Sequence, residues 1–259
     1  MSTTKNTEHC MVCGRRLDYL MTAEDLVCVY CGKEQREHVK CRKGDFVCDD
    51  CHGKEVRKMI EDVARTSPSP DPLEIAELMM AVPGLPMLSC DHAFIAAGAL
   101  MAALRNSPYG AKIGEAEIRE AFARTAKQAH GGYCGLTGVC GVAPAIGACF
   151  SIFLGARCGS GREQKIVMEA VTGVSAAITD LTGPSCCKAY VRAALVVAVA
   201  MFAEKFGVVL PVKDTATVCL HTQRHPHGCR EEKCPYFQKP SKDIFAEAKF
   251  VPGTTSCVT

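Results

Sequence analysis

The sequence has no tryptophan, and aromatic residues make up only 6% of its 259 residues. Proteins that bind single-stranded nucleic acid stack the bases on aromatic side chains, so a base-stacking surface is not expected here. The formal net charge is only +2, whereas nucleic-acid binding needs a concentration of positive charge against the phosphates. Nucleic acid is therefore not an expected partner.

Long apolar runs are also missing. The longest apolar stretch, residues 193–203, is shorter than the roughly 20 residues that cross a bilayer. The first residues, MSTTKNTEHC, are polar and unlike a secretory signal. Alternating strand patterns are nearly absent. We therefore expect a cytoplasmic, mainly α protein that does not bind to membranes; the oligomeric state is left open.

Cysteine, in contrast, is abundant, with 18 residues in the chain. In a reducing compartment such a number indicates metal binding or catalysis rather than a disulfide framework.

Composition divides the chain into four parts. Residues 1–53 are rich in Cys–x–x–Cys pairs and predict a small zinc-ribbon-like module. Residues 54–72 are expected to form a helix and a proline-rich linker. Residues 73–212 predict an all-helical domain, because apolar residues recur at helical spacing and the segments end at glycine or proline. Residues 213–259 are rich in cysteine and histidine and are expected to complete a metal site of the helical domain.

Two Cys–x–x–Cys pairs in the first part are each followed by glycine: Cys10 and Cys13, then Cys28 and Cys31. Such a turn directs two thiolates at one ion, and two turns complete a tetrahedral site of the kind that zinc prefers. We expect structural zinc here.

A second set of ligands follows this first one. Cys41, Cys48 and Cys51 supply three thiolates, and the fourth ligand is His38, His52 or Asp45. A second structural zinc is expected. The spacing does not decide whether the pairs serve the two ions in chain order or in a crossed arrangement.

The segment 131–149, GGYCGLTGVCGVAPAIGAC, combines three cysteines with six glycines and has no charge. Cys149, like Cys158 beyond it, fits an ordinary core cysteine. Cys134 and Cys140 are each followed by glycine, which lets a ligand approach the backbone.

Further cysteines lie at the start of a predicted helix and in the last part of the chain. Cys186 and Cys187 follow Gly183–Pro184, where a helix N-terminus would stabilise thiolate. Cys219, Cys229 and Cys234 follow later, the last before a proline, as is frequent at iron–sulfur ligands. With Cys134 and Cys140 these predict one redox-sensitive centre, a [4Fe–4S] cluster in preference to zinc. Because adjacent cysteines point apart, we expect Cys186 and Cys187 to have different roles.

Six motifs together resemble an uncharacterised cysteine-rich domain family of anaerobic prokaryotes: CMVCG, CVYCG, CRKGDFVCDDCH, YCGLTGVCG, GPSCCK and CREEKCPYF. The resemblance spans most of the chain and implies a zinc-ribbon-like segment before a helical domain, with no assigned activity. Members tend to carry Gly-His where this chain has Gly44–Asp45, so the fourth ligand of the second zinc stays open. A fainter similarity links GVCGVAPAIGACFSIFLGA to the glycine-rich core of iron–sulfur serine dehydratases.

Three residues are candidates for acid–base catalysis beside the cluster: His130, His92 and Lys188. The alternatives, His130 as a helix C-cap residue and His92 as a core or cap residue, remain open.

Two functions are compatible with these features. One is an enzyme, of lyase or sulfur-transfer type, that binds a small substrate or sulfide at an open cluster iron. The other is a non-catalytic accessory protein that docks a protein partner through its zinc module and delivers a cluster.

Overall fold

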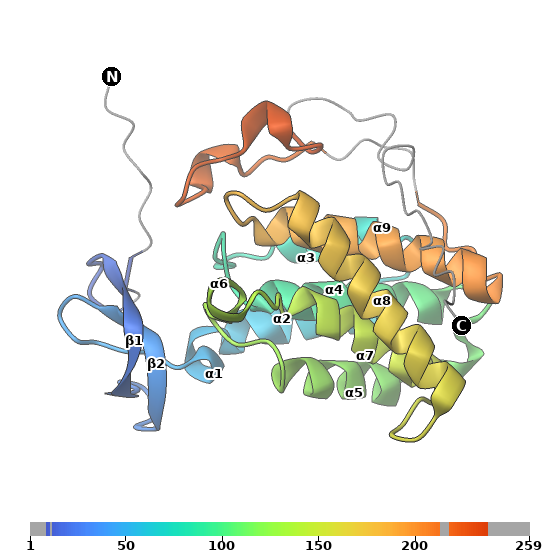
Figure 1. Ribbon diagram of the computed structural model, residues 1–259, viewed down its shortest axis with the longest axis horizontal. Helices are drawn as coiled ribbons and strands as arrows, with labels where there is room; N and C mark the ends of the chain where they lie inside the picture. The colour runs from blue at the N-terminus through green and yellow to red at the C-terminus, as the bar shows by residue number, and fades with distance from the viewer. Residues whose placement is uncertain (1–8, 11, 213–217, 238–259) are drawn as a thin grey trace, which may run out of the picture.

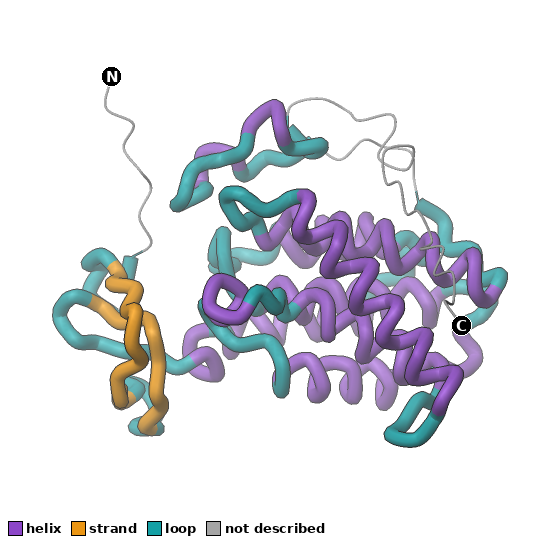
Figure 2. The backbone as a smooth tube through the Cα atoms, viewed as in Figure 1, coloured by secondary structure: helices purple, strands orange, loops and turns teal. Residues whose placement is uncertain are grey.

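A computed structural model describes residues 9–10, 12–212 and 218–237, so the ends of the first and fourth predicted parts lie outside the described residues. The described chain is mainly helical, with a small hairpin at one end (Figures 1 and 2). This confirms the predicted fold class. The strands are β1 (Leu17–Val27) and β2 (Glu34–Cys41), and the α-helices are α1 (Asp49–His52), α2 (Lys54–Thr66), α3 (Pro72–Met80), α4 (Asp91–Asn106), α5 (Glu115–Ala126), α6 (Tyr133–Thr137), α7 (Val142–Leu154), α8 (Gly161–Asp180) and α9 (Cys187–Phe206).

The hairpin is antiparallel, with Leu17 opposite Cys41 and Val27 opposite Glu34. Its buried side chains are few. Besides the thiols of Cys28 and Cys48, the small cluster contains Leu26 and Phe46. So small an apolar core does not stabilise a module of this size without an additional link such as a metal ion.

α4 lies at the centre of the helical domain, where it contacts α2, α3, α5, α7 and α9. Its residues are buried on all sides from Asp91 to Leu104. Small side chains allow this: a Cβ added to Gly98 would lie 2.8 Å from the Phe122 ring of α5. None of the described helices is long and apolar enough to cross a membrane.

The helices α4, α7 and α9 all begin at the end of the domain that faces the hairpin and α6 (Figure 1). They approach closely there. A Cβ on Gly141, which precedes α7, would lie 2.9 Å from Ala129 and 3.6 Å from the Cβ of Ala93 in α4. This close approach brings the N-termini of α4 and α7 together.

The segment expected to be a helix and linker is part of the helical domain. In α2, Val56, Ile60 and Ala64 are buried in the main core. The loop that follows is fixed to the end of α4, because Asn106 donates hydrogen bonds to the carbonyl oxygens of Ser67 and Ser69 at 2.7 and 2.8 Å. Proline gives this loop its extended backbone, and side-chain hydrogen bonds hold it against the domain.

The far ends of α7 and α9 are held together by aromatic rings. Phe202 is fully buried, and its ring centroid lies 4.3 Å from that of Phe150 and 5.0 Å from that of Phe153. We expect Phe202→Ala to lower the free energy of unfolding by about 3–5 kcal/mol, through lost burial and the cavity left behind. Denaturant unfolding of the full chain measures this, with exposed Met168→Ala in α8 as the control. Equal stability of the two variants would contradict this packing.

Candidate metal centres

Four thiols of the N-terminal module converge on one point. Cys28, Cys31, Cys48 and Cys51 place their Sγ atoms within 4.8 Å of one another, with 3.7 Å between Cys31 and Cys48. Zn–S bonds of about 2.3 Å in a tetrahedron separate two thiolates by about 3.8 Å. The group can therefore hold a metal ion such as zinc.

A second group joins three thiols and one carboxylate. Cys10, Cys13, Cys41 and Asp45 bring one ligand atom each to within 4.8 Å of the others, and the Cys13 and Cys41 sulfurs are 3.3 Å apart. Asp45 Oδ2 is buried and has no hydrogen-bond partner. An unpaired buried carboxylate oxygen is costly, and a metal ion among these atoms would supply its partner.

The ligands are thus grouped in the crossed arrangement, one of the two that the spacing left open. β1 and β2 carry the first Cys–x–x–Cys pair to Cys41 and the second pair to Cys48 and Cys51. Neither His38 nor His52 joins a group among the described residues. The ring of His38 instead lies 2.9 Å from the carbonyl oxygen of Leu20 through Nδ1, and His52 is exposed.

Close packing of the thiols changes their acidity. Burial raises the pKa of Cys28, but the N–H groups of Cys48, Cys31 and Tyr30 outweigh it and bring the pKa to about 6. Contacts with the thiols of Cys31 and Cys48, with burial added, raise the pKa of Cys51 to about 12. Without a cation these thiols compete for charge, and a bound metal ion would hold all four as thiolates.

Two double variants distinguish the crossed from the sequential arrangement. We expect Cys31→Ser/Cys51→Ser to lose one zinc ion, because both residues belong to one group, and Cys13→Ser/Cys31→Ser to lose both ions. Native mass spectrometry of the full chain counts the ions. The reverse result would mean that the pairs bind in chain order.

Asp45 provides a single-site test. We expect Asp45→Asn to weaken only the ion held with Cys10, Cys13 and Cys41, since the carboxylate charge is removed. His38→Gln and His52→Gln are the controls and should retain both ions during titration with a chelator. A zinc loss in either histidine variant equal to that in Asp45→Asn would contradict the assignment.

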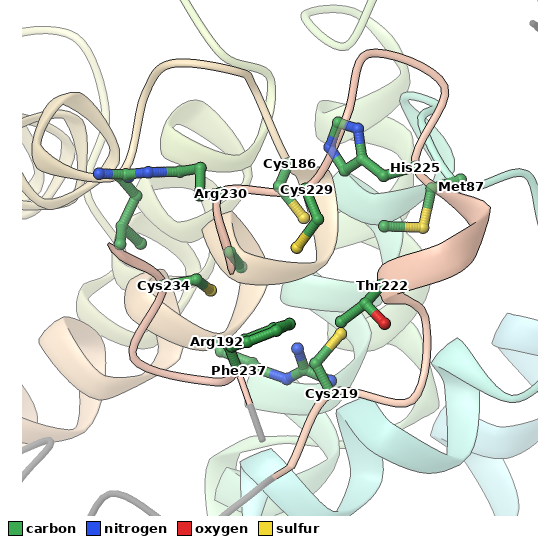
Figure 3. A pocket seen from close by; sticks show the side chains of 12 residues that line it. Met87, Cys186, Arg192, Cys219, Thr222, His225, Cys229, Arg230, Cys234 and Phe237 are labelled. Atoms are coloured by element: carbon green, nitrogen blue, oxygen red, sulfur yellow. The ribbon is translucent and has the colours of Figure 1, made fainter. Parts of the chain in front are cut away.

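In the helical domain, four of the seven predicted cluster ligands line one partly open cavity of about 450 Å³, open space included. Cys186 comes from the start of α9, and Cys219, Cys229 and Cys234 come from the described C-terminal segment, residues 218–237 (Figure 3). No three of these thiols lie within 4.8 Å of one another among the described residues. Their spacing is therefore wider than that of the two groups in the N-terminal module.

The C-terminal segment is attached mainly by polar contacts. Cys219 N–H donates to the carbonyl oxygen of Tyr236 at 2.7 Å and closes the segment on itself. The ring of His225 lies 3.0 Å from the carbonyl oxygen of Ser185 through Nε2, and Arg224 donates to the carbonyl oxygen of Leu85 at 3.2 Å. His225 and Tyr236 are among its few buried side chains.

Two thiols of this segment have the local geometry of the zinc module. In each case the backbone N–H of the second residue after the cysteine faces the sulfur. His221 N lies 3.4 Å from the sulfur of Cys219, and Glu231 N lies 3.3 Å from that of Cys229. The same relation occurs at Cys10 and Cys41, at 3.4 and 3.3 Å. Such N–H groups stabilise thiolate. Glu231, in the turn after Cys229, has φ 51°, a left-handed conformation that is uncommon for a residue with a side chain.

Buried cations lie beside the cavity. Arg192, in its wall, pairs with Glu77 through two hydrogen bonds of 2.6 and 2.9 Å. Burial lowers the pKa of Arg192, but the ion pair with Glu77 and the nearby Cys219 outweigh burial. The net result is a pKa above its usual range. Lys188 is fully buried; burial, with Arg224 and Arg192 nearby, lowers its pKa to about 8. Together these groups favour negative charge at the cavity.

The three candidates for acid–base catalysis have different surroundings. His92 is fully buried, and its Nε2 has no hydrogen-bond partner; burial, then Lys188, lowers its pKa to about 3. Lys188 Nζ donates to the carbonyl oxygen of Met80 at 3.4 Å. His130 is exposed, with Nε2 3.2 Å from the carbonyl oxygen of Lys127; the C-cap of α5 is Lys127 itself, three residues earlier. None of the three lines the cavity.

The fold and these sites define the class: a cysteine-rich, helical protein with an N-terminal module that can bind metal. A family model matches residues 60–237, and the chain belongs to that family, the family of unknown function DUF5714. The match begins after the N-terminal module and includes the whole cavity. No curated protein and no solved structure matches the chain, so the similarity to serine dehydratases and the anaerobic origin stay predictions.

Proposed function

We propose that this protein binds a [4Fe–4S] cluster through Cys186, Cys219, Cys229 and Cys234, with two structural zinc ions in its N-terminal module. One observation carries the proposal: four thiols surround one cavity at wider spacing than a single metal ion allows. A four-iron cluster places its ligands farther apart than zinc does, because each thiolate binds a different iron. Thiolate is also the donor that such clusters take.

The surroundings of the cavity support a negatively charged cluster. N–H groups donate to the sulfurs of Cys219 and Cys229, and hydrogen bonds of this kind tune iron–sulfur clusters. Arg192 and Lys188 supply positive charge beside it. A bound cluster would also cross-link the C-terminal segment to α9, which would supply the stability that its small apolar contact does not.

Four protein ligands leave no iron open, which favours a carrier of electrons or clusters over a catalyst. A carrier needs a partner, and the zinc module has the surface for one. Its exposed apolar side chains include Tyr19, Met21, Val29 and Tyr30, of which Met21 is 94% exposed. Exposed apolar groups gathered on one module favour protein contact. The zinc module would dock the partner, and the helical domain would carry the cluster.

An enzyme that acts on a small substrate or sulfide is the second candidate. The cavity is partly open, so a small molecule could reach an iron if one of the four thiols did not ligate. His225, which lines the cavity, would then be nearer for proton transfer than His92 or Lys188, which do not.

Serine substitution tests the ligand set. We expect Cys229→Ser, in anaerobically reconstituted full-length protein, to lose most of the broad visible absorption of this cluster, since serine is a poor iron ligand. Cys186→Ser, Cys219→Ser and Cys234→Ser should do the same. Cys149→Ser is the control, because Cys149 is buried in the core beside the carbonyl oxygens of Ala145 and Ala97.

The pattern of losses distinguishes the candidates. Loss in all four variants supports the carrier. If one of the four keeps the full absorption while the others lose it, the cluster has three thiolate ligands and the enzyme with an open iron is favoured. Unchanged absorption in all four would refute the site.

A further inference from the structure

Four other cysteines lie at the meeting point of three helix N-termini. Cys90 is the N-cap of α4, Cys187 is the first residue of α9, and Cys140 directly precedes Gly141, the N-cap of α7. Cys134 lies in α6, the short helix beside them. Helix N-termini favour negative charge, and three of them converge here.

Local contacts show that these residues lie together. The backbone N–H of Ser89, the residue before Cys90, is close enough to Cys187 to lower the pKa of its thiol. Gly141, next to Cys140, packs against Ala93 in the first turn of α4. Both Cys90 and Cys140 pack against the main core. Three segments far apart in the sequence therefore deliver their cysteines to one place.

The thiolates also influence one another electrostatically. Five of the six pairs repel: Cys90 with Cys134 and Cys140, Cys134 with Cys140, and Cys187 with both Cys134 and Cys140. A cation between these thiolates would relieve the repulsion.

The spacing again excludes a compact zinc site. Among the described residues, no three of these sulfurs come within 4.8 Å of one another. Their mutual electrostatic influence makes them neighbours, and a cluster of several metal atoms takes thiolates spaced more widely than one zinc ion does. Cys134 is exposed, whereas the other three are partly buried, so the site reaches the surface on the side of α6.

We propose that Cys90, Cys134, Cys140 and Cys187 bind a second [4Fe–4S] cluster. The second site goes beyond the proposed function, and either cluster can be absent without the other. Cys186 and Cys187 would ligate different clusters. Their Cα atoms are about 3.8 Å apart, the length of one peptide unit, so the two clusters would be close neighbours. Two-cluster ferredoxins likewise take ligands for both clusters from one short run of cysteines.

The second site connects the zinc module to the helical domain. Asp49 of α1 accepts a hydrogen bond from the N–H of Gly131 at 3.0 Å, three residues before Cys134. Arg57 of α2 donates to Asp91, next to Cys90, at 2.8 Å and also lies 3.7 Å from Asp50 of α1. A partner docked on the zinc module would therefore be near the exposed side of the second cluster.

Iron and sulfide analysis of reconstituted full-length variants tests the proposal. We expect Cys90→Ser and Cys140→Ser each to retain half of the wild-type iron and sulfide, and Cys229→Ser to retain the other half. Cys158→Ser, an exposed cysteine outside both sets, should retain all of it. After chemical reduction, the wild-type electron paramagnetic resonance spectrum should show coupling between two clusters, and each half-loaded variant an isolated cluster.

Each outcome decides one proposal. If Cys90→Ser and Cys140→Ser keep all iron while Cys229→Ser loses all, the second site is refuted and the first stands. If Cys229→Ser keeps all iron while Cys90→Ser loses all, the first site is refuted and the second stands. Circular dichroism and the zinc content confirm that each variant is folded, so that iron loss reports on the site.

Discussion

Packing of α4 against α7 and α9 positions the cysteines at the N-termini of these three helices. Gly141 allows the start of α7 to lie against Ala129 and Ala93, and α4 contacts both other helices. Each of these helices carries a cysteine at or next to its N-terminus. The same contact therefore forms part of the core and brings ligand atoms and helix dipoles to one end of the domain.

Where thiols make up much of the buried core, a bound metal ion would stabilise the fold. In the N-terminal module, sulfur atoms and two apolar residues, Leu26 and Phe46, form the buried cluster, so a bound ion would contribute directly to the free energy of folding. The C-terminal segment has few buried side chains and is attached by polar contacts to Ser185 and Leu85. In the N-terminal module and in residues 218–237, bound metal would supply links where an apolar core is lacking, while the central helices are stabilised by apolar packing.

Much of this arrangement is predictable from local sequence. Cys–x–x–Cys turns indicate the ligands of the N-terminal module, and apolar periodicity indicates the helices, because both depend on residues close together in the chain. Which Cys–x–x–Cys pair shares an ion with which later ligands depends on the register of the β1–β2 hairpin. The crossed arrangement and the choice of Asp45 as fourth ligand are therefore visible only in the structure. That Cys186 and Cys187 have different roles is expected because they are adjacent in the chain. Which other cysteines lie near each of them is not predictable from local sequence.

Cys90 of the proposed second site is not indicated by the local sequence either. It precedes an apolar helix and is neither followed by glycine nor paired with a nearby cysteine, so local sequence gives only its position at a helix start. Cys186 and Cys187 are likewise placed by the sequence at a helix start. The long-range packing of α4 against α9 is what places Cys90 near the other thiols.

One measurement tests the central claim most directly: zinc, iron and acid-labile sulfide determined together on the full-length protein purified without oxygen. We expect two zinc ions per chain, with iron and sulfide in equal amounts sufficient for two four-iron clusters. Protein that contains zinc at every site, with neither iron nor sulfide, would contradict the account.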